Sequence, residues 1–257
     1  MAKAREILKI LLYRAKLLNF ITKLRNRTYR ILREGYYPRK FWDGWSDHYS
    51  NQKTQQKIDK SQYWLLKKIE ELKPKNVLEI GCGFGINLRF LLNHLSYPVV
   101  MTGFDISESM IRKAKENLNN RALLGCADIN ALPLFERSYE LVFTHAILMH
   151  VSERDIENAI REISRVVQKH LIIIEETYWS VGNFQGTLFK PNEYTFIYDY
   201  PRLLSKCGLK IIEMKEEKGD LNLIYFLCSN QEPSSQLWMP HLERRFTAEL
   251  LQTLFIH

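Results

Sequence analysis

Residues 77–85 read Val-Leu-Glu-Ile-Gly-Cys-Gly-Phe-Gly, an apolar run that leads directly into three glycines at alternate positions. A short apolar run of this kind predicts a buried strand, and the pattern at 86–95 predicts a helix after it. Glycine tolerates the backbone conformations of a sharp turn and lets a ligand approach where a Cβ atom would block it. The helix N-terminus that follows would offer free N–H donors. We therefore expect a ligand-binding turn between a strand and a helix.

Strand and helix patterns continue to alternate after this turn, which implies a mostly parallel sheet with right-handed crossovers. A short helix is expected near 201–207, and the last two strands would form a closing hairpin. The expected fold class is α/β: a Rossmann-like, seven-stranded, mostly parallel sheet with helices on both faces and an N-terminal helical extension. The strands are expected at 77–80, 99–104, 122–127, 141–144, 171–175, 209–213 and 221–227, and the main helices at 86–95, 107–118 and 154–167.

The spacing of the glycines separates two classes of nucleotide site. The dinucleotide fingerprint G-x-G-x-x-G would need glycine at position 86, where Ile86 stands. The spacing here is G-x-G-x-G. Acidic residues follow the next two expected strands, at Asp105 and Asp128. A carboxylate suits a ribose diol because each of its oxygens can accept one hydroxyl proton.

In these residues the sequence resembles the class I S-adenosylmethionine-dependent methyltransferases of the small-molecule type. The first motif of that family is acidic-x-G-x-G-x-G, and it is matched by Glu79, Gly81, Gly83 and Gly85. The resemblance implies that S-adenosyl-L-methionine is the cofactor and that the glycine turn lies against its methionine half. It covers residues 42–227, with departures at 139–140 and at 168–170 that do not touch the cofactor residues.

The same resemblance assigns residues to the adenosine half of the cofactor. It implies that Asp105 binds both ribose hydroxyls and that Asp128 receives the adenine amino group. Ile106 and Ile129 are expected to sandwich the adenine ring. Thr144, at the end of the fourth strand, is expected to belong to the same site.

Methyl transfer from a sulfonium is an in-line displacement, so the protein must align the nucleophile, exclude water and remove one proton. The candidate bases are His150, His145 and Glu175. Each also has a structural interpretation: His150 as a packed histidine that caps the next helix, His145 as a backbone contributor, and Glu175 as a solvated residue at the end of a strand. No metal site is expected, because the four cysteines lack zinc-site spacing.

Two segments are expected to cover the acceptor. The aromatic stretch 41–50, which reads as a loop or short helix before a helix at about 51–72, holds Trp42, Trp45 and Tyr49, and the insertion 177–199 holds Tyr178. An ordinary aromatic core patch is the alternative for the first segment. We expect the acceptor to enter between the two segments and to be methylated on oxygen, as a small molecule, a glycan or a lipid-linked compound.

The positive charge of the chain is concentrated at its N-terminus. The formal charge is +8, yet residues 1–40 hold twelve Lys and Arg and only two acidic residues. Residues 1–34 are expected to form a basic amphipathic helix that binds an anionic membrane surface. A helix packed on the core or on a second subunit is the alternative, and a transit peptide is a third interpretation. The apolar arc comprises Ile7, Ile10, Leu11, Leu17, Leu18, Phe20, Ile21 and Leu24.

The expected organisation is therefore a basic arm (1–40), a methyltransferase domain (41–230) and a helical tail (231–257). The protein is expected in the cytoplasm, peripheral on the inner face of the membrane if the arm binds there, and its oligomeric state stays open. Two other functions stay open: an RNA or protein methyltransferase that uses the arm, and a non-catalytic cofactor-binding assembly protein. Nucleic acid is disfavoured, because residues 144–147 lack the Asn/Asp-Pro-Pro-aromatic loop of base-amine methylases.

Overall fold

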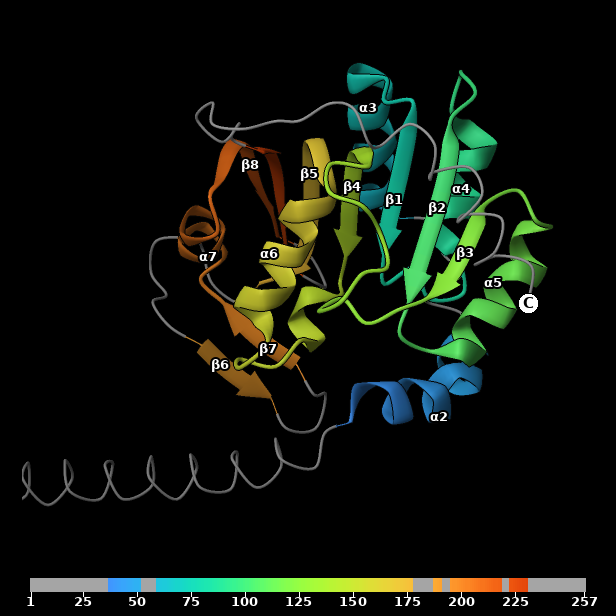
Figure 1. Ribbon diagram of the computed structural model, residues 1–257, viewed down its shortest axis with the longest axis horizontal. Helices are drawn as coiled ribbons and strands as arrows, with labels where there is room; N and C mark the ends of the chain where they lie inside the picture. The colour runs from blue at the N-terminus through green and yellow to red at the C-terminus, as the bar shows by residue number, and fades with distance from the viewer. Residues whose placement is uncertain (1–36, 52–58, 178–186, 191–194, 219–221, 231–257) are drawn as a thin grey trace, which may run out of the picture.

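The computed structural model describes residues 37–51, 59–177, 187–190, 195–218 and 222–230. Its centre is a seven-stranded sheet in the order β3-β2-β1-β4-β5-β9-β8 (Figure 1). The first five strands of the chain pair in parallel, and the last two add an antiparallel hairpin. The predicted fold class is confirmed. The strands are β1 (Asn76–Ile80), β2 (Val100–Asp105), β3 (Leu123–Cys126), β4 (Tyr139–His145), β5 (Val167–Glu176), β8 (Leu209–Glu217) and β9 (Leu223–Asn230).

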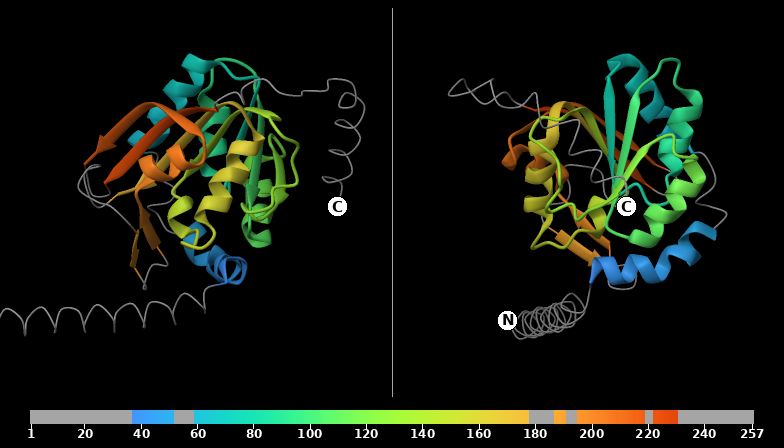
Figure 2. Two further views of the ribbon diagram at one scale, coloured as in Figure 1. Left: turned by 60° about the vertical axis from the view of Figure 1, so that its left-hand side comes forward. Right: turned by 45° about the vertical axis from the view of Figure 1, so that its right-hand side comes forward.

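Helices cover both faces of the sheet, as Figure 2 shows. α3 (Lys60–Leu72), α4 (Ile86–His94) and α5 (Glu108–Leu118) share one hydrophobic cluster with alternate strand residues such as Val77 and Ile172. α6 (Ile156–Val166) and α7 (Tyr200–Lys206) share the other cluster, with Leu78 and Ile173. Successive side chains of a strand point to opposite faces, so neighbouring residues in one strand supply two separate cores.

α2 (Pro38–Asn51) crosses the carboxyl ends of the strands (Figure 1). α2 has the helical form, one of the two forms expected for this stretch, and it extends over 14 residues. The next helix begins at Lys60 instead of about residue 51. Proline at the first position favours a helix start because its missing N–H would be unpaired there anyway. Asp59 starts α3 with a capping box to Gln62, and its extended backbone cannot continue a helix from the preceding residues.

The insertion expected to be irregular contains a separate two-stranded antiparallel sheet, β6 (Thr187–Lys190) and β7 (Thr195–Tyr198). All four residues of β7 are buried. A strand covered on both faces shows no alternation of polar and apolar residues, which is why the sequence pattern did not predict it. β7 lies against η2 (Leu148–His150), a short 3₁₀ turn after β4.

Several expectations lie outside the described residues: the helical arm over residues 1–34, Tyr178 and the tail from 231 to 257. Within the part of the chain that the structure describes, no helix has both the length and the apolar character needed to cross a membrane.

Candidate active site

The glycine turn after β1 has the backbone conformation that its sequence predicts. Gly81, Gly83 and Gly85 all have positive φ angles, of 75°, 51° and 83°. The N–H of Gly81 donates to the carbonyl of Phe104 at 2.7 Å, which ties the turn to the end of β2. A Cβ atom on Gly81 would lie 2.4 Å from Cγ1 of Ile147. Glycine is therefore required at position 81 both by its φ angle and by the close approach of another loop.

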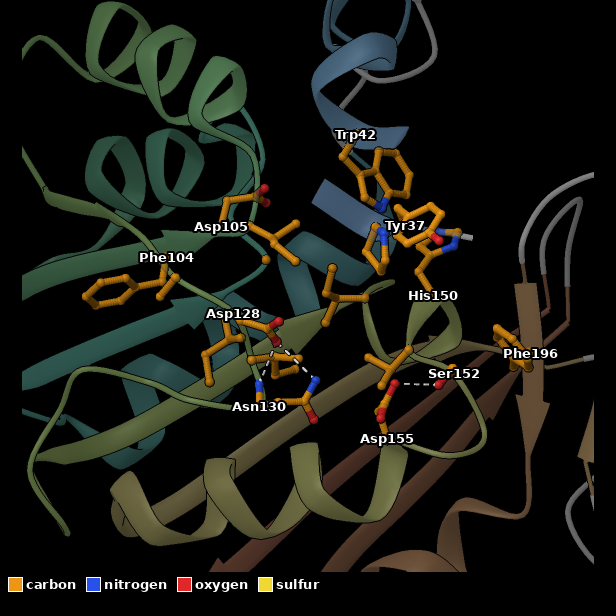
Figure 3. A pocket seen from close by; sticks show the side chains of 18 of the residues that line it. Tyr37, Trp42, Phe104, Asp105, Asp128, Asn130, His150, Ser152, Asp155 and Phe196 are labelled. Atoms are coloured by element: carbon orange, nitrogen blue, oxygen red, sulfur yellow. Dashed lines mark hydrogen bonds between the residues drawn. The ribbon is translucent and has the colours of Figure 1, made fainter. Parts of the chain in front are cut away.

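A cavity of about 810 Å³ lies at the carboxyl ends of the strands, between the sheet and α2 (Figure 3). Open α/β sheets bind ligands at this edge. Five residues predicted to bind the cofactor line the cavity together, whereas Glu79, Gly83, Gly85 and Thr144 do not line it. The five are Gly81, Asp105, Ile106, Asp128 and Ile129.

The two aspartates of the cavity are held by backbone N–H groups. Asp105 accepts hydrogen bonds from the N–H of Gly83 and of Ser107, each at 2.9 Å, one on each carboxylate oxygen. Burial nevertheless raises the pKa of Asp105 above its ordinary value. Asp128 accepts from the N–H and the side-chain amide of Asn130, at 2.9 and 3.0 Å. A carboxylate oxygen can accept a second hydrogen bond, so both groups keep capacity for a ligand in the cavity.

Glu79 lies behind the glycine turn in a buried polar network. Its Oε1 accepts from the amide of Asn87 at 2.8 Å, and Asn87 in turn accepts from Gln62 at 2.9 Å. Its Oε2 is buried and has no hydrogen-bond partner among the described residues. The hydroxyl of Thr144 is also buried without a hydrogen-bond partner among these residues. Burial raises the pKa of Glu79 to about 8. A buried carboxyl oxygen without a hydrogen-bond partner is costly, and it suits a cationic ligand group.

The opposite end of the cavity is formed by His150 and Trp42. His150 ends η2, and Trp42 of α2 packs edge-on against its ring, with ring centroids 4.9 Å apart (Figure 3). Tyr37 completes this aromatic end. Trp45, by contrast, stacks on Phe41 at 5.4 Å, is 44% exposed and does not line the cavity. The side chain of Tyr49 lies outside the described residues.

The other two candidate bases do not reach the cavity. Nε2 of His145 is hydrogen-bonded to the hydroxyl of Ser61 at 2.7 Å, and burial lowers the pKa of the imidazole. Glu175 is fully buried and accepts the N–H groups of residues 147, 148 and 149 at 3.1, 2.9 and 3.2 Å. Burial raises its pKa to about 7, against these hydrogen bonds. Because three N–H groups that begin η2 face the end of β5, the carboxylate of Glu175 caps that turn instead of pointing into the cavity.

Sequence patterns missed most residues at the acceptor end. Tyr37 precedes α2, Ser152 and Asp155 follow η2 and are hydrogen-bonded to each other at 2.6 Å, and Phe196 comes from β7 (Figure 3). Tyr198 of the same strand donates to the carbonyl of Val151 at 2.6 Å, which holds the loop in place. Phe196 lies in the insertion that was expected to cover the acceptor, whereas Tyr37, Ser152 and Asp155 lie outside both expected segments. These three residues share no motif that could have grouped them with the acceptor end.

Comparison with known proteins agrees with this geometry. The model of a methyltransferase domain family matches residues 77–170, the part of the chain that contains the glycine turn, both aspartates and His150. Residues 77–170 therefore carry a methyltransferase domain. The predicted family and the predicted cofactor, S-adenosyl-L-methionine, are thereby confirmed.

Two curated relatives of this chain are named as O-methyltransferases. A malonyl-[acyl-carrier protein] O-methyltransferase of Anoxybacillus flavithermus is 40% identical over 75 residues, which are 28% of each chain. A ubiquinone biosynthesis O-methyltransferase of Coxiella burnetii is 34% identical over 94 residues, which are 34% of this chain and 39% of that protein. The chain thus spans well under half the length of each of these two relatives.

Solved structures share the fold of this chain. The magnesium protoporphyrin IX methyltransferase of Synechocystis PCC 6803, solved with bound S-adenosylhomocysteine, superimposes with a TM-score of 0.58 over 75% of this chain and 98% of that chain. Its sequence is 15% identical, so the similarity establishes the fold alone.

Proposed function

We propose that this protein transfers a methyl group from S-adenosylmethionine to an oxygen atom of a small-molecule, glycan or lipid-linked acceptor. One observation carries the proposal: a single cavity has the cofactor-motif residues at one end and a histidine held by a tryptophan at the other. The two curated relatives are named as O-methyltransferases, which supports oxygen as the acceptor atom.

The residues at the motif end fit the cofactor in charge and in shape. Asp105 and Asp128 offer acceptor capacity for ribose hydroxyls and an adenine amine, and Ile106 and Ile129 offer apolar surface to the base. The unpartnered Oε2 of Glu79 suits the α-ammonium group at the methionine end. When bound, the cofactor supplies an electrophilic methyl group on a positively charged sulfur.

His150 is the proposed general base. His150 would accept the hydroxyl proton of the acceptor as the acceptor oxygen takes up the methyl group that the bound cofactor would supply, with the neutral demethylated cofactor as the leaving group. The edge-on contact with Trp42 restricts the orientation of the imidazole. α2, which covers the strand ends, limits the access of water.

The test combines a binding measurement with an acceptor screen. Calorimetry should detect binding of S-adenosylhomocysteine to the full chain, and radiolabelled S-adenosylmethionine should label an acceptor among small phenols and carboxylates, glycans or lipid-linked glycans. Absence of S-adenosylhomocysteine binding would overturn the proposal. Labelling of RNA or protein instead would establish the alternative enzyme, and binding without transfer to any class would favour a non-catalytic assembly protein.

We also propose that residues 1–34 hold the enzyme at an anionic membrane surface. The support is the sequence alone, since a basic residue near such a surface contributes about 1 kcal/mol to binding. The full chain should sediment with vesicles that contain anionic lipid at low salt and remain in solution at high salt. Failure to bind, or equal binding after deletion of residues 1–34, would contradict the proposal.

A further inference from the structure

Asp43 attaches α2 to the first turn of α5. Its Oδ1 accepts the hydroxyl of Ser107 at 2.7 Å, the hydroxyl of Ser109 at 3.0 Å and the N–H of Ser109 at 3.3 Å. These hydrogen bonds, helped by the nearby Arg39, outweigh burial and hold the pKa of Asp43 below its ordinary value. Asp43 is therefore an anion at neutral pH, and it is placed where the free N–H groups of a helix start favour negative charge.

Ser107 connects this contact to the cofactor end of the cavity. Its N–H donates to Asp105 at 2.9 Å while its hydroxyl donates to Asp43 at 2.7 Å. The same hydroxyl accepts the N–H of Met110 at 3.1 Å and so caps α5. One fully buried residue thus bonds both the carboxylate that faces the cofactor and the carboxylate that anchors α2.

The direction of Trp42 depends on the rotation of α2. Trp42 precedes Asp43 in the chain, and successive residues of a helix point about 100° apart around its axis. When Asp43 is bonded to α5, Trp42 points into the cavity and meets His150 (Figure 3). If α2 turned or lifted, both contacts would be lost together.

We propose that Asp43 is a positioning residue that couples cofactor binding at Asp105, through Ser107, to the seating of Trp42 against His150. The inference rests on the proposed function, because it assumes that Asp105 faces a bound cofactor. Coupling of this kind is reciprocal: cofactor favours the docked position of α2, and docked α2 retains the cofactor. Cofactor binding would then stabilise the complete acceptor end.

Other polar contacts between α2 and α5 lie at the surface and provide controls. Lys113 pairs with Asp47 at 2.7 Å, with the Asp47 side chain 88% exposed, and Arg39 lies 3.6 Å from Glu108. Exposed pairs of this type contribute little to stability. Asp47 lies one turn after Asp43 on the same helix, so Asp47→Ala removes an acidic group from α2 without touching Ser107.

The experiment measures S-adenosylhomocysteine binding to the full chain by calorimetry, with hydrogen exchange of residues 38–51 followed by mass spectrometry. Asp43→Ala should weaken binding about tenfold, because it removes charge-assisted hydrogen bonds. Asp43→Asn, whose amide oxygen can still accept from Ser107, should recover part of the affinity, and Asp47→Ala should bind like wild type. S-adenosylhomocysteine should slow exchange of 38–51 in wild type and in Asp47→Ala but not in Asp43→Ala.

Trp42→Ala tests whether Asp43 acts through the tryptophan. In the Asp43→Ala background, Trp42→Ala should change the affinity for S-adenosylhomocysteine much less than it does in wild type. Unchanged affinity in Asp43→Ala, or ligand-dependent protection of 38–51 that survives this substitution, overturns the coupling. If Asp43→Ala does not fold, the wild-type protein alone decides: the coupling is overturned if S-adenosylhomocysteine does not slow hydrogen exchange of residues 38–51. Absence of binding to wild type contradicts the proposed function itself, so the two failures are distinguishable.

Discussion

The two ends of the cavity are built in different ways. At the cofactor end, Gly81, Asp105 and Asp128 follow or end adjacent parallel strands, and sheet register alone brings them to one edge. At the acceptor end, α2, the loop after β4 and the strand β7 meet only through side-chain contacts such as Trp42 with His150. The first end can be read from strand ends along the chain, whereas the second depends on how distant segments pack.

The two ends touch where Ile147 of the acceptor loop lies against Gly81 of the cofactor turn. Ala146, just before it, has a positive φ of 54°, which is uncommon for a residue with a side chain. The hydrogen bonds of Glu175 to the next three N–H groups stabilise this loop. Substitutions at either end and at this contact should therefore have separable effects.

His150→Ala should reduce turnover by about 10²–10⁴ on an acceptor found by the screen, because it removes the proposed base. Affinity for S-adenosylhomocysteine should stay within a few fold of wild type, since His150 belongs to the acceptor end. His94→Ala is the control, because His94 is exposed and stacks on Phe90 at 4.3 Å on α4. Lower thermal stability with normal turnover per folded molecule would instead identify His150 as a packing residue.

Gly81→Ala should lower the free energy of unfolding by about 2–4 kcal/mol, because it combines a left-handed backbone with overpacking against Ile147. Denaturant unfolding measures the loss. Adding Ile147→Ala should recover part of it if the contact between the two ends is responsible. Gly44→Ala, in α2 with open space around the glycine, should be neutral or slightly stabilising. If Gly81→Ala lowers the free energy of unfolding equally in the wild-type and the Ile147→Ala backgrounds, backbone strain at position 81 is the sole cause of the loss.

Asp105→Ala should weaken S-adenosylhomocysteine binding by about 2–3 kcal/mol, or roughly 30- to 150-fold, as the ribose hydroxyls lose a charged acceptor. Asp105→Asn should lose less, because one oxygen remains. Isothermal calorimetry on the folded variants provides the measurement. An affinity equal to that of wild type in Asp105→Ala would remove Asp105 from the cofactor site.

Glu79 should release a proton when S-adenosylhomocysteine binds at pH 7. In the free protein its pKa is raised to about 8, so the group is largely protonated at that pH. An ammonium group beside Oε2 would favour the carboxylate form of Glu79 and lower its pKa, so binding would release up to one proton. The affinity for S-adenosylhomocysteine would therefore increase by less than about tenfold from pH 7 to pH 9. Binding enthalpies in buffers of different ionisation enthalpy count the proton. Glu79→Gln should abolish the release, and a release that persists in this variant would come from another group.

The sequence alone determined the α/β class, the seven strands, the glycine turn and the acidic residues after two strands. These features are local. Hydrophobic periodicity indicates which stretches are buried. Glycine is required where the backbone has a positive φ angle and a Cβ atom would have no room, as at Gly81. Parallel pairing then brings strand ends to one edge without further information. The sequence therefore also predicted that Gly81, Ile106 and Asp128 would meet in one cavity.

Only the tertiary structure decided which candidate bases face that cavity. His145, His150 and Glu175 all follow or end strands in the sequence, yet His145 is bonded to Ser61 and Glu175 caps η2, so His150 alone of the three lines the cavity. The hydrogen bond between Asp43 and Ser107, which are 64 residues apart in the chain, could not be predicted from the sequence either. Side-chain direction in irregular loops depends on contacts with distant segments, and one sequence without its packing carries no periodic signal for such contacts.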